Sequence, residues 1–399
     1  MNIFKKMYCR MYQGIFRMAM PLLPYREPIT LESVLDIKSV LKSNNINKVL
    51  IVTDSGVRGL GLTTPLEKDL EENEIGVTVY DKTIPNPTID CIEEALDMYI
   101  SEGCKGIIAF GGGSVMDCAK VVGARSVKPN QSVEKMKGLL KVGKKLPLLI
   151  AIPTTAGTGS ETTLAAVITD SKTHHKYPIN DFNLIPQYAV LDSTLTLGLP
   201  KGLTATTGMD ALTHAIEAYI GKSTTKKTRE CALEACKLIF ENLPKAYSNG
   251  KDKEARQNML RASYLAGVAF TRSYVGYVHA IAHSLGGKYG VPHGLANATI
   301  LPYMLNEYGE SASKKLKEIA VYCGLSDEGA SPKVASSKVI NKIIEFNNNM
   351  QIPSKIEGIK EKDIPALAVL ADKEGNPLYP VPKLMSAKEL EEIYRLIKK

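Results

Sequence analysis

Four histidines and one aspartate in the second half of the chain have spacings that suit a metal site. Asp210 and His214 are four positions apart in "GMDALTHAIEAY", and His279 and His283 repeat this spacing in "YVHAIAHSLGGKYGVPHG", which returns with His293 after a glycine turn. Residues four apart lie on one face of a helix. Nitrogen and oxygen donors without cysteine suit Zn²⁺ or Fe²⁺ equally well. The spacing predicts a metal site, and it leaves open which imidazole stays outside.

A structural role is the alternative for any single histidine. A lone histidine on an apolar helix is more often a hydrogen-bonded core residue than a ligand. Three histidines within fifteen residues, beside an Asp–x₃–His helix, are harder to explain in that way. The two remaining histidines, His174 and His175, fall in a polar stretch, where we expect a loop and no metal.

A glycine-rich segment, "AFGGGSVMDCAK", follows a predicted strand and opens a predicted helix. In this setting backbone N–H groups and the helix dipole bind a diphosphate. Gly111, Gly112 and Gly113 allow the backbone to approach an anion closely, and Ser114 is expected to cap the helix. The segment matches neither standard nucleotide motif, so a glycine turn without a ligand remains the alternative.

Two further strand ends supply polar groups. The segment "PTTAGTGSE" adds hydroxyl groups at the same sheet edge, from Thr154, Thr155, Thr158 and Ser160. Open parallel sheets bind ligands in a crevice at this edge. Asp54 ends the first clear strand, where a carboxylate can accept hydrogen bonds from a ribose and repel a 2′-phosphate. This favours NAD over NADP, with an exposed turn aspartate as the alternative.

The pattern along the chain predicts the elements that hold these residues. Apolar strand-like runs at 48–54, 76–81, 106–114, 146–161 and 187–192 alternate with helical patterns such as 91–103. This alternation predicts a parallel sheet covered on both faces. Helical patterns then follow at 204–220, 226–245, 253–269, 272–289, 313–323, 334–349 and 387–398. We expect an N-terminal extension (1–30), an α/β dinucleotide-binding domain (31–196) and an all-helical metal-binding domain (197–399).

Composition narrows the class of protein. The 399 residues are long enough for two domains, and 44% hydrophobic with 23% charged residues is typical of a soluble globular chain. The net charge of +8 is dispersed, unlike the basic stripe of a nucleic-acid binder. Seven cysteines without a CxxC pair indicate a reducing compartment, so the cytoplasm is the default location.

The first 23 residues, "MNIFKKMYCRMYQGIFRMAMPLL", contain no acidic residue and have apolar side chains at helical spacing. Lys5, Lys6, Arg10 and Arg17 interrupt the apolar run, which excludes a membrane-spanning helix. Three interpretations remain: a helix packed on the body or on a partner subunit, a helix on a membrane surface, and an organelle transit peptide.

Four of these segments together resemble a known family. "GGGSVMDCAK", "PTTAGTGSE", "GMDALTHAIEAY" and "HAIAHSLGGKYGVPHGLANA" are similar, in order and spacing, to the signatures of the iron-containing (group III) alcohol dehydrogenases, from about residue 46 to the C-terminus. The resemblance implies a Rossmann-like domain and a helical domain in a dehydroquinate synthase-like arrangement. It also implies that Asp210, His214, His279 and His293 ligate the metal, while His283 stands beside it.

The same resemblance implies the residues that contact the dinucleotide. They are Asp54, Asn86, Gly112, Gly113, Ser114, Asp117, Thr154, Thr155, Thr158 and Lys176. The implied activity is that of a metal-dependent NAD(P)-linked alcohol dehydrogenase or aldehyde reductase, with Fe²⁺ as the expected metal and Zn²⁺ as the alternative. The metal acts as a Lewis acid on the substrate oxygen, hydride passes to the nicotinamide, and His283 relays the proton.

Other functions remain open at this stage. One is a zinc-type polyol dehydrogenase, another a dehydroquinate synthase-like lyase, and a third a scaffold without activity. A small alcohol or aldehyde substrate and a homodimer or higher homo-oligomer are expected, with no nucleic-acid partner and no integral membrane segment.

Two departures from the family pattern bear on the substrate pocket and on the first strand. The family's usual Phe-Gly strand is replaced by "MAMPLLPYREPITLES", which makes the first strand doubtful. Ser284 stands where the family mostly has proline, and Tyr274 and Tyr277 flank the predicted helix. These changes are expected to reshape the substrate pocket.

Overall fold

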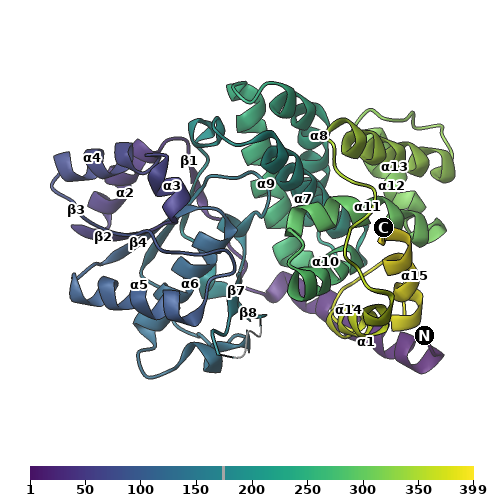
Figure 1. Cartoon of the computed structure of the whole chain (residues 1–399), viewed down its shortest axis with the longest axis horizontal. Coiled ribbons are helices and arrows are strands. Elements are labelled where there is room, and N and C mark those ends of the chain that lie inside the picture. Colours follow the sequence, from purple (N-terminus) through teal and green to yellow (C-terminus); the bar gives the residue numbers. More distant parts are fainter. Residues whose placement is uncertain (173–175) are drawn as a thin grey trace. The chain divides into compact units, whose positions relative to one another are not determined.

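The computed structural model describes residues 1–172 and 176–399, so the polar loop predicted for His174 and His175 lies outside the described residues. The chain forms two compact units (Figure 1). One is Pro24–Gly198, and the other joins Met1–Leu23 to Leu199–Lys399. Within the described residues, no helix is both long enough and apolar enough to span a bilayer.

The first unit is built on a parallel sheet, as predicted. Its six strands, counted over the described residues, run in the order β1-β9-β6-β4-β2-β3. Their bounds are β1 Ile29–Leu31, β2 Lys48–Val52, β3 Gly76–Tyr80, β4 Gly106–Gly111, β6 Leu148–Pro153 and β9 Tyr188–Val190. The apolar runs at 48–54, 76–81, 106–114, 146–161 and 187–192 each contain one of these strands.

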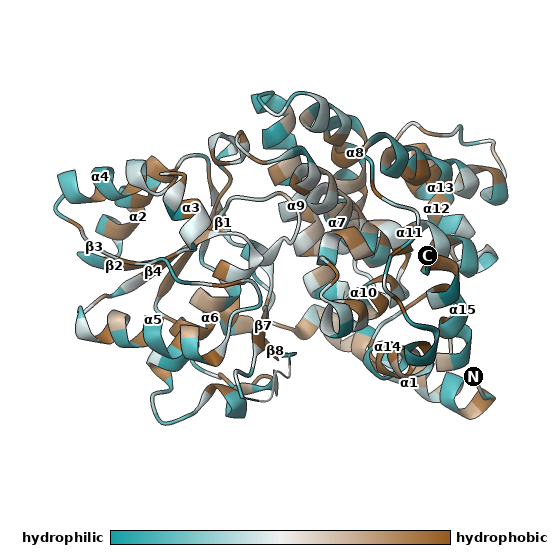
Figure 2. Ribbon diagram, viewed as in Figure 1, coloured by the Kyte–Doolittle hydropathy of each residue, from teal (hydrophilic) through white to brown (hydrophobic). Residues whose placement is uncertain are grey.

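Helices cover both faces of this sheet. Alternate residues of β2 enter different cores: Leu50 and Val52 pack into one cluster, Val49 and Ile51 into the other. This follows from the two-residue side-chain period of a strand. The first core includes residues of α5 (Ile89–Ser101) and α6 (Gly113–Val127), and the second includes residues of α2 (Ile37–Ser43) and α4 (Thr64–Glu72). Figure 2 shows the hydrophobic colouring of the strands between these helices.

The strand order reverses at β2, which pairs with β3 on one side and with β4 on the other. Ligands of open parallel sheets bind at such a reversal, beyond the carboxyl ends of the strands. The segments that follow β2 and β4 carry Asp54 and Gly112, so the two predicted cofactor segments leave neighbouring strands at one sheet edge.

Three features of this unit go beyond the sequence-based prediction. The doubtful first strand exists as β1, which pairs in parallel with β9 over three residues. A small second sheet contains β5 (Gly138–Leu139), β7 (Ala165–Thr169) and β8 (Lys176–Asn180). Its strands have two to five residues, too short for a clear period. Short helix α3 (Ser55–Gly59) follows β2 directly.

The regular secondary structure of the second unit, over its described residues, is helical apart from a single β-bridge, which confirms the predicted class. Its helices are α1 Ile3–Ala19, α7 Lys201–Ile220, α8 Lys226–Ser248, α9 Lys253–Ser273, α10 Tyr277–Tyr289, α11 His293–Tyr308, α12 Glu310–Tyr322, α13 Pro332–Asn349, α14 Ile364–Gly375 and α15 Ala387–Ile397. Helices α11 and α14 had not been predicted. The pattern at 272–289, read as one helix, is the end of α9 and all of α10, with a break between them.

Candidate metal centre

Helix α7 is the element on which the centre is built. Most of its side chains are buried, including Asp210 and His214, one turn apart. The helix packs closely on α8, and at Gly208 a Cβ would lie 2.4 Å from Leu243. A glycine at that position therefore lets the backbone of α7 approach α8. This packing fixes the helix face that carries the Asp–x₃–His pair.

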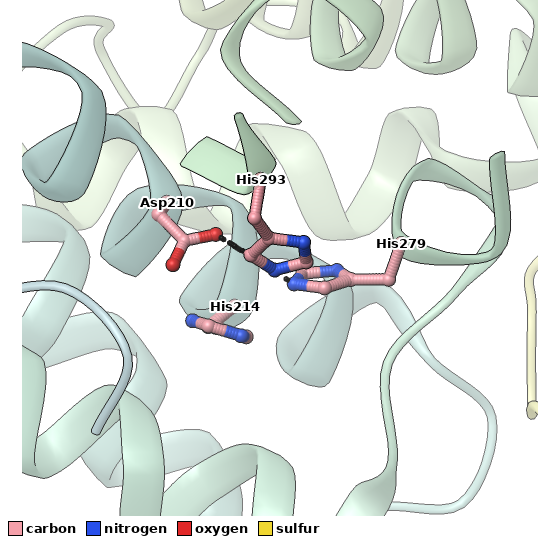
Figure 3. Close-up of side chains that lie close together, drawn as sticks. All are labelled: Asp210, His214, His279 and His293. Atoms are coloured by element: carbon pink, nitrogen blue, oxygen red, sulfur yellow. Dashed lines mark ion pairs between the residues drawn. The ribbon is translucent and has the colours of Figure 1, made fainter. Parts of the chain in front are cut away.

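Two other helices bring the remaining candidates to α7 (Figure 3). His279 lies in the first turn of α10, and His293 is the first residue of α11. One ligand atom from each of Asp210, His214, His279 and His293 lies within 4.8 Å of all the others. Nε2 of His293 is 3.4 Å from Oδ1 of Asp210, close to the roughly 3.4 Å that separates two ligands on a tetrahedral ion at about 2.1 Å.

Glu217, one turn beyond His214 on α7, orients His279. Its Oε2 lies 2.6 Å from Nδ1 of His279, and its two oxygens accept the N–H groups of Gly276 and Val278 at 2.8 and 2.9 Å. Burial raises the pKa of Glu217 to about 8, opposed by these backbone N–H groups. With Nδ1–H directed at Glu217, Nε2 of His279 faces the cluster with its lone pair.

The chemistry of this donor set fits a divalent cation. Nε2 of His279 is buried and has no hydrogen-bond partner among the described residues. Burial, followed by the neighbouring imidazoles, lowers the pKa of His279 well below its usual value, so the ring is neutral. A neutral imidazole with a free lone pair is the form that ligates metals, and leaving it unpaired in a core is costly without an ion.

Two more residues complete the surroundings of the cluster. Nδ2 of Asn297 donates to Oδ1 of Asp210 at 2.6 Å and lies 3.1 Å from Nε2 of His293. The ring of Phe270 stacks on His214 with centroids 4.1 Å apart. We had predicted neither Asn297 nor Glu217, although both offer a signal: each continues the helical spacing of a predicted ligand, four residues after His293 and three after His214.

His283 lies beside the cluster of four candidate ligands. Its ring stacks against His293 with centroids 5.2 Å apart, and its side chain is 42% exposed. Nδ1 lies 2.6 Å from Oε1 of Glu374, which also accepts the hydroxyl of Tyr379 at 2.7 Å. Burial raises the pKa of Glu374, but the charge of His283 and the two hydrogen bonds outweigh it and lower that pKa overall. His283, Glu374 and Tyr379 thus form a chain of polar contacts that leads away from the cluster of candidate ligands.

The break before α10 explains why one continuous helix was a wrong prediction there. A Cβ on Gly276 would lie 2.5 Å from Oε1 of Glu217, so only glycine fits where the carboxylate accepts its N–H. Tyr274 adopts a left-handed φ of 61° and ends α9. Its ring packs near Phe16 and Tyr379. The contacts of Glu217 thus determine the backbone conformation at the start of α10.

Two other residues of α10 that depart from the family pattern or flank that departure, Tyr277 and Ser284, have structural partners. The hydroxyl of Tyr277 is buried and bonded to Asn376 and to the backbone of Met385. The hydroxyl of Ser284 lies 2.5 Å from that of Tyr394. These contacts tie α10 to the C-terminal helices.

The predicted dinucleotide residues all belong to the α/β unit. Asn86, with a left-handed φ of 57°, accepts Nζ of Lys176 at 2.5 Å, and its N–H donates to Oγ of Ser114 at 3.3 Å. The sites of a Cβ on Gly112 and on Gly113 lie 3.7 and 3.0 Å from Thr155 and Thr158. The N–H of Thr154 donates to the carbonyl of Gly111 at 3.2 Å.

One detail of this region differs from the sequence-based expectation. Ser114 does not cap α6, because the helix already begins at Gly113, and the preceding Gly112 has no side chain to occupy the first N–H groups. These groups remain available to an anion. The carboxylate of Asp117 accepts the Ser160 hydroxyl and the Val167 N–H at 3.1 and 3.0 Å.

Asp54 caps α3 by accepting the N–H of Val57 at 2.9 Å with Oδ1. The carboxylate thus has a local role in the turn, and the residue is half-buried rather than exposed.

Comparison with known proteins shows which protein family shares the sequence and fold of this chain. Residues 30–193 match the family model of iron-containing alcohol dehydrogenase, and residues 204–397 match that of the Fe-containing alcohol dehydrogenase family, C-terminal. A 1,3-propanediol dehydrogenase of Citrobacter freundii is 39% identical over 87% of this chain and 90% of its own. An NAD-dependent methanol dehydrogenase of Bacillus methanolicus is 39% identical over 84% of this chain and 88% of its own.

A solved structure agrees. The crystal structure of a 1,3-propanediol oxidoreductase superposes with a TM-score of 0.89 at 35% identity, covering 93% of this chain and 98% of the other. Both halves of the chain match the models, and the buried Asp/His cluster lies in the half matched by the C-terminal one. The chain therefore belongs to the iron-containing alcohol dehydrogenase family and is an alcohol oxidoreductase.

Proposed function

We propose that this enzyme is a metal-dependent, NAD-linked alcohol dehydrogenase that also reduces the corresponding aldehydes. The observation that carries the proposal is the cluster of four ligand atoms within 4.8 Å, with a neutral imidazole held by Glu217 at its centre. Asp210, His214, His279 and His293 would hold the ion, and Fe²⁺ is the ion that the family name favours. The same donors suit Zn²⁺.

The chemistry divides between the bound groups and the chain. The divalent cation supplies Lewis acidity toward the substrate oxygen, and the nicotinamide dinucleotide accepts or donates hydride. Glu217 keeps the proton of His279 on Nδ1 and so keeps Nε2 in its ligating form. His283, with Glu374 and Tyr379 behind it, accepts the hydroxyl proton in oxidation and returns it in reduction.

The dinucleotide side of the proposal depends on the α/β unit. The first N–H groups of α6, behind Gly112, would bind the diphosphate, with Ser114, Thr154, Thr155 and Thr158 contributing hydroxyl groups and Asn86 and Lys176 further polar contacts. The negative charge of Asp54, which follows β2, favours NAD over NADP because it would repel a 2′-phosphate. The NAD-dependent relative from Bacillus methanolicus supports this preference.

Short primary alcohols and diols are the proposed substrates. The similar methanol and 1,3-propanediol dehydrogenases support both classes, and these relatives are oxidoreductases rather than lyases. A rate assay that compares ethanol, 1-propanol, 1,2-propanediol and 1,3-propanediol separates a simple alcohol dehydrogenase from a polyol enzyme. A homo-oligomer and a cytoplasmic location complete the proposal. The seven cysteines, all within the described ranges, form no disulfide with one another, in keeping with a reducing compartment.

The deciding experiment uses anaerobically purified enzyme. We expect about one divalent ion per chain by elemental analysis, and a steady rise of NADH absorbance when alcohol and NAD are added. His279→Ala should lose both while keeping a folded circular-dichroism spectrum. Full activity of metal-free enzyme, or a His279→Ala variant that retains its ion, would contradict the proposal.

A further inference from the structure

Helix α1 is fixed to the helical unit along one narrow side. The guanidinium of Arg10 donates to the carbonyls of Val381 and Pro382 at 2.8 and 2.9 Å. The amide of buried Gln13 donates to the carbonyls of Pro377 and Tyr379 at 3.1 and 2.8 Å. Polar side chains that satisfy backbone carbonyls hold a helix in a defined orientation. The side of α1 that faces the body is therefore specified.

The opposite side of α1 is apolar and exposed. Its side chains recur every three to four residues and are all more than half exposed: Ile3 68%, Phe4 79%, Met7 64%, Tyr8 53%, Met11 60%, Ile15 56% and Met18 72%. Leu22, just beyond the helix, is 86% exposed. Figure 2 shows hydrophobic colouring along this terminal helix. A contiguous apolar face of this length marks an interaction surface.

Cationic side chains outnumber acidic ones around this face. Residues 1–26 contain no aspartate or glutamate, and Lys6, Arg10 and Arg17 border the apolar face. Lys5 also lies beside it and pairs with Asp372 of α14 at 2.7 Å. Beside it lies a depression of about 390 Å³. Its lining contains three cationic side chains, three apolar ones and a single acid: Lys6, Arg10, Lys383, Ile3, Met7, Leu384 and Glu389. Cations next to exposed apolar groups suit an anionic headgroup beside acyl chains.

We propose that α1 is a docking surface for an anionic lipid bilayer, lying in the plane of the interface with its apolar face buried among the headgroups. The apolar face spans about two-fifths of the helix circumference, wider than the two-in-seven seam of a paired helix. A second copy of α1 would bring Lys6, Arg10 and Arg17 against the same three cations of the first copy, which opposes pairing. Both family models begin after α1, so this surface is an addition to the catalytic chain.

Co-sedimentation of the full-length enzyme with lipid vesicles tests the proposal. We expect binding to vesicles of phosphatidylcholine mixed with phosphatidylglycerol, weak or no binding to phosphatidylcholine alone, and weaker binding as salt shortens the Debye length. Met11→Glu and Met18→Glu, in the middle of the face, should each reduce the partition coefficient about tenfold or more. Lys6→Glu should reduce it about fivefold or more.

A matched control variant distinguishes the loss of the apolar face of α1 from a general effect of an added negative charge. Val334, 52% exposed on α13, supplies the control Val334→Glu, which should bind vesicles as the unchanged enzyme does. Alcohol oxidation in solution should be the same for all four variants, which shows that they are folded. Absence of binding to phosphatidylglycerol vesicles overturns the proposal. So does a molar mass, by light scattering, that falls in Met11→Glu without any vesicle binding, because the occupant is then a second copy.

Discussion

At the scale of single residues, Glu217 connects two parts of the centre. It lies on α7 with two of the candidate ligands, and it accepts hydrogen bonds from the imidazole of His279 and from the backbone at the start of α10. One carboxylate thus sets the tautomer of a ligand and the position of the helix that carries it.

Replacement of Glu217 by glutamine should weaken metal binding about 10- to 100-fold, because the amide cannot accept all three N–H groups and offers its own NH₂ to one of them. Titration of the metal-free variant with Fe²⁺ or Zn²⁺ measures the affinity. Activity should recover at high metal concentration. An affinity equal to that of the unchanged enzyme would mean that Glu217 only supports the fold.

Asp54 offers a test of dinucleotide preference. In Asp54→Ser the hydroxyl can still accept the N–H of Val57 and cap α3, while the negative charge is lost. Removing this charge should improve binding of the 2′-phosphate by about 1 kcal/mol or more, which lowers the KM for NADP about fivefold. Steady-state kinetics with both dinucleotides measure the change. An unchanged NADP to NAD ratio would place Asp54 in the turn alone.

Glu374 should affect the pH dependence of turnover. An ionised carboxylate beside an imidazole favours the protonated ring, so Glu374→Gln should leave His283 neutral down to lower pH. The acidic limb of kcat/KM against pH should then move to lower pH, and kcat should fall roughly tenfold as the ring loses its orientation. Tyr379→Phe removes only the hydroxyl behind Glu374 and should shift the limb less.

At the scale of elements, the junction between α9 and α10 is set by the site rather than by helix propensity. The apolar pattern runs through 272–289 without interruption, yet the chain leaves the helix for Tyr274, Val275 and Gly276. The hydrogen bonds to Glu217 and the close approach at Gly276 compensate for the lost helical turn.

Two glycine substitutions, one at the start of α10 and one within it, should have opposite effects. Gly276→Ala places a methyl group against Glu217 and should lower the free energy of unfolding by about 1–3 kcal/mol, with loss of bound metal. Gly287, within α10, has nothing within 4 Å of its Cβ position, so Gly287→Ala should raise stability by roughly 0.5–1 kcal/mol. Thermal denaturation and metal analysis measure both effects. Equal stability of the two variants would contradict this account.

At the scale of the whole molecule, the two candidate sites divide between the two units. All four candidate ligands, with Glu217 and His283, belong to the helical unit, and all predicted dinucleotide contacts belong to Pro24–Gly198. Each unit has its own core, so the sites should respond separately to the loss of a ligand.

Removal of the metal should therefore destabilise the helical unit selectively. An ion that binds only the folded state at 100 times its Kd contributes about 2.7 kcal/mol. Its removal should lower the Tm of this unit by roughly 5–10 °C. NAD should still bind to the metal-free protein. Calorimetry on the chelated protein measures this binding. Loss of NAD binding together with the metal would show that the two sites depend on each other.

The sequence by itself determined what depends on local pattern. Strand runs ending in polar residues predicted the parallel sheet and its ligand-binding edge. The spacing of one aspartate and four histidines predicted a metal site, because residues four apart share a helix face. It also showed an N-terminal segment without acidic residues. The family resemblance added the exclusion of His283, which spacing alone could not decide.

Only the tertiary structure decided what depends on contacts between distant segments. Glu217 meets His279 from 62 residues away, and Asp117 meets Val167 from 50 residues away. Helical spacing could mark Glu217 as a candidate, but no local pattern identifies the partner of either carboxylate. Likewise, the sequence shows that α1 has an apolar face, but only packing decides that Gln13 turns inward while Met11 and Met18 face solvent. Local periodicity fixes which residues share a face, and long-range packing fixes what that face meets.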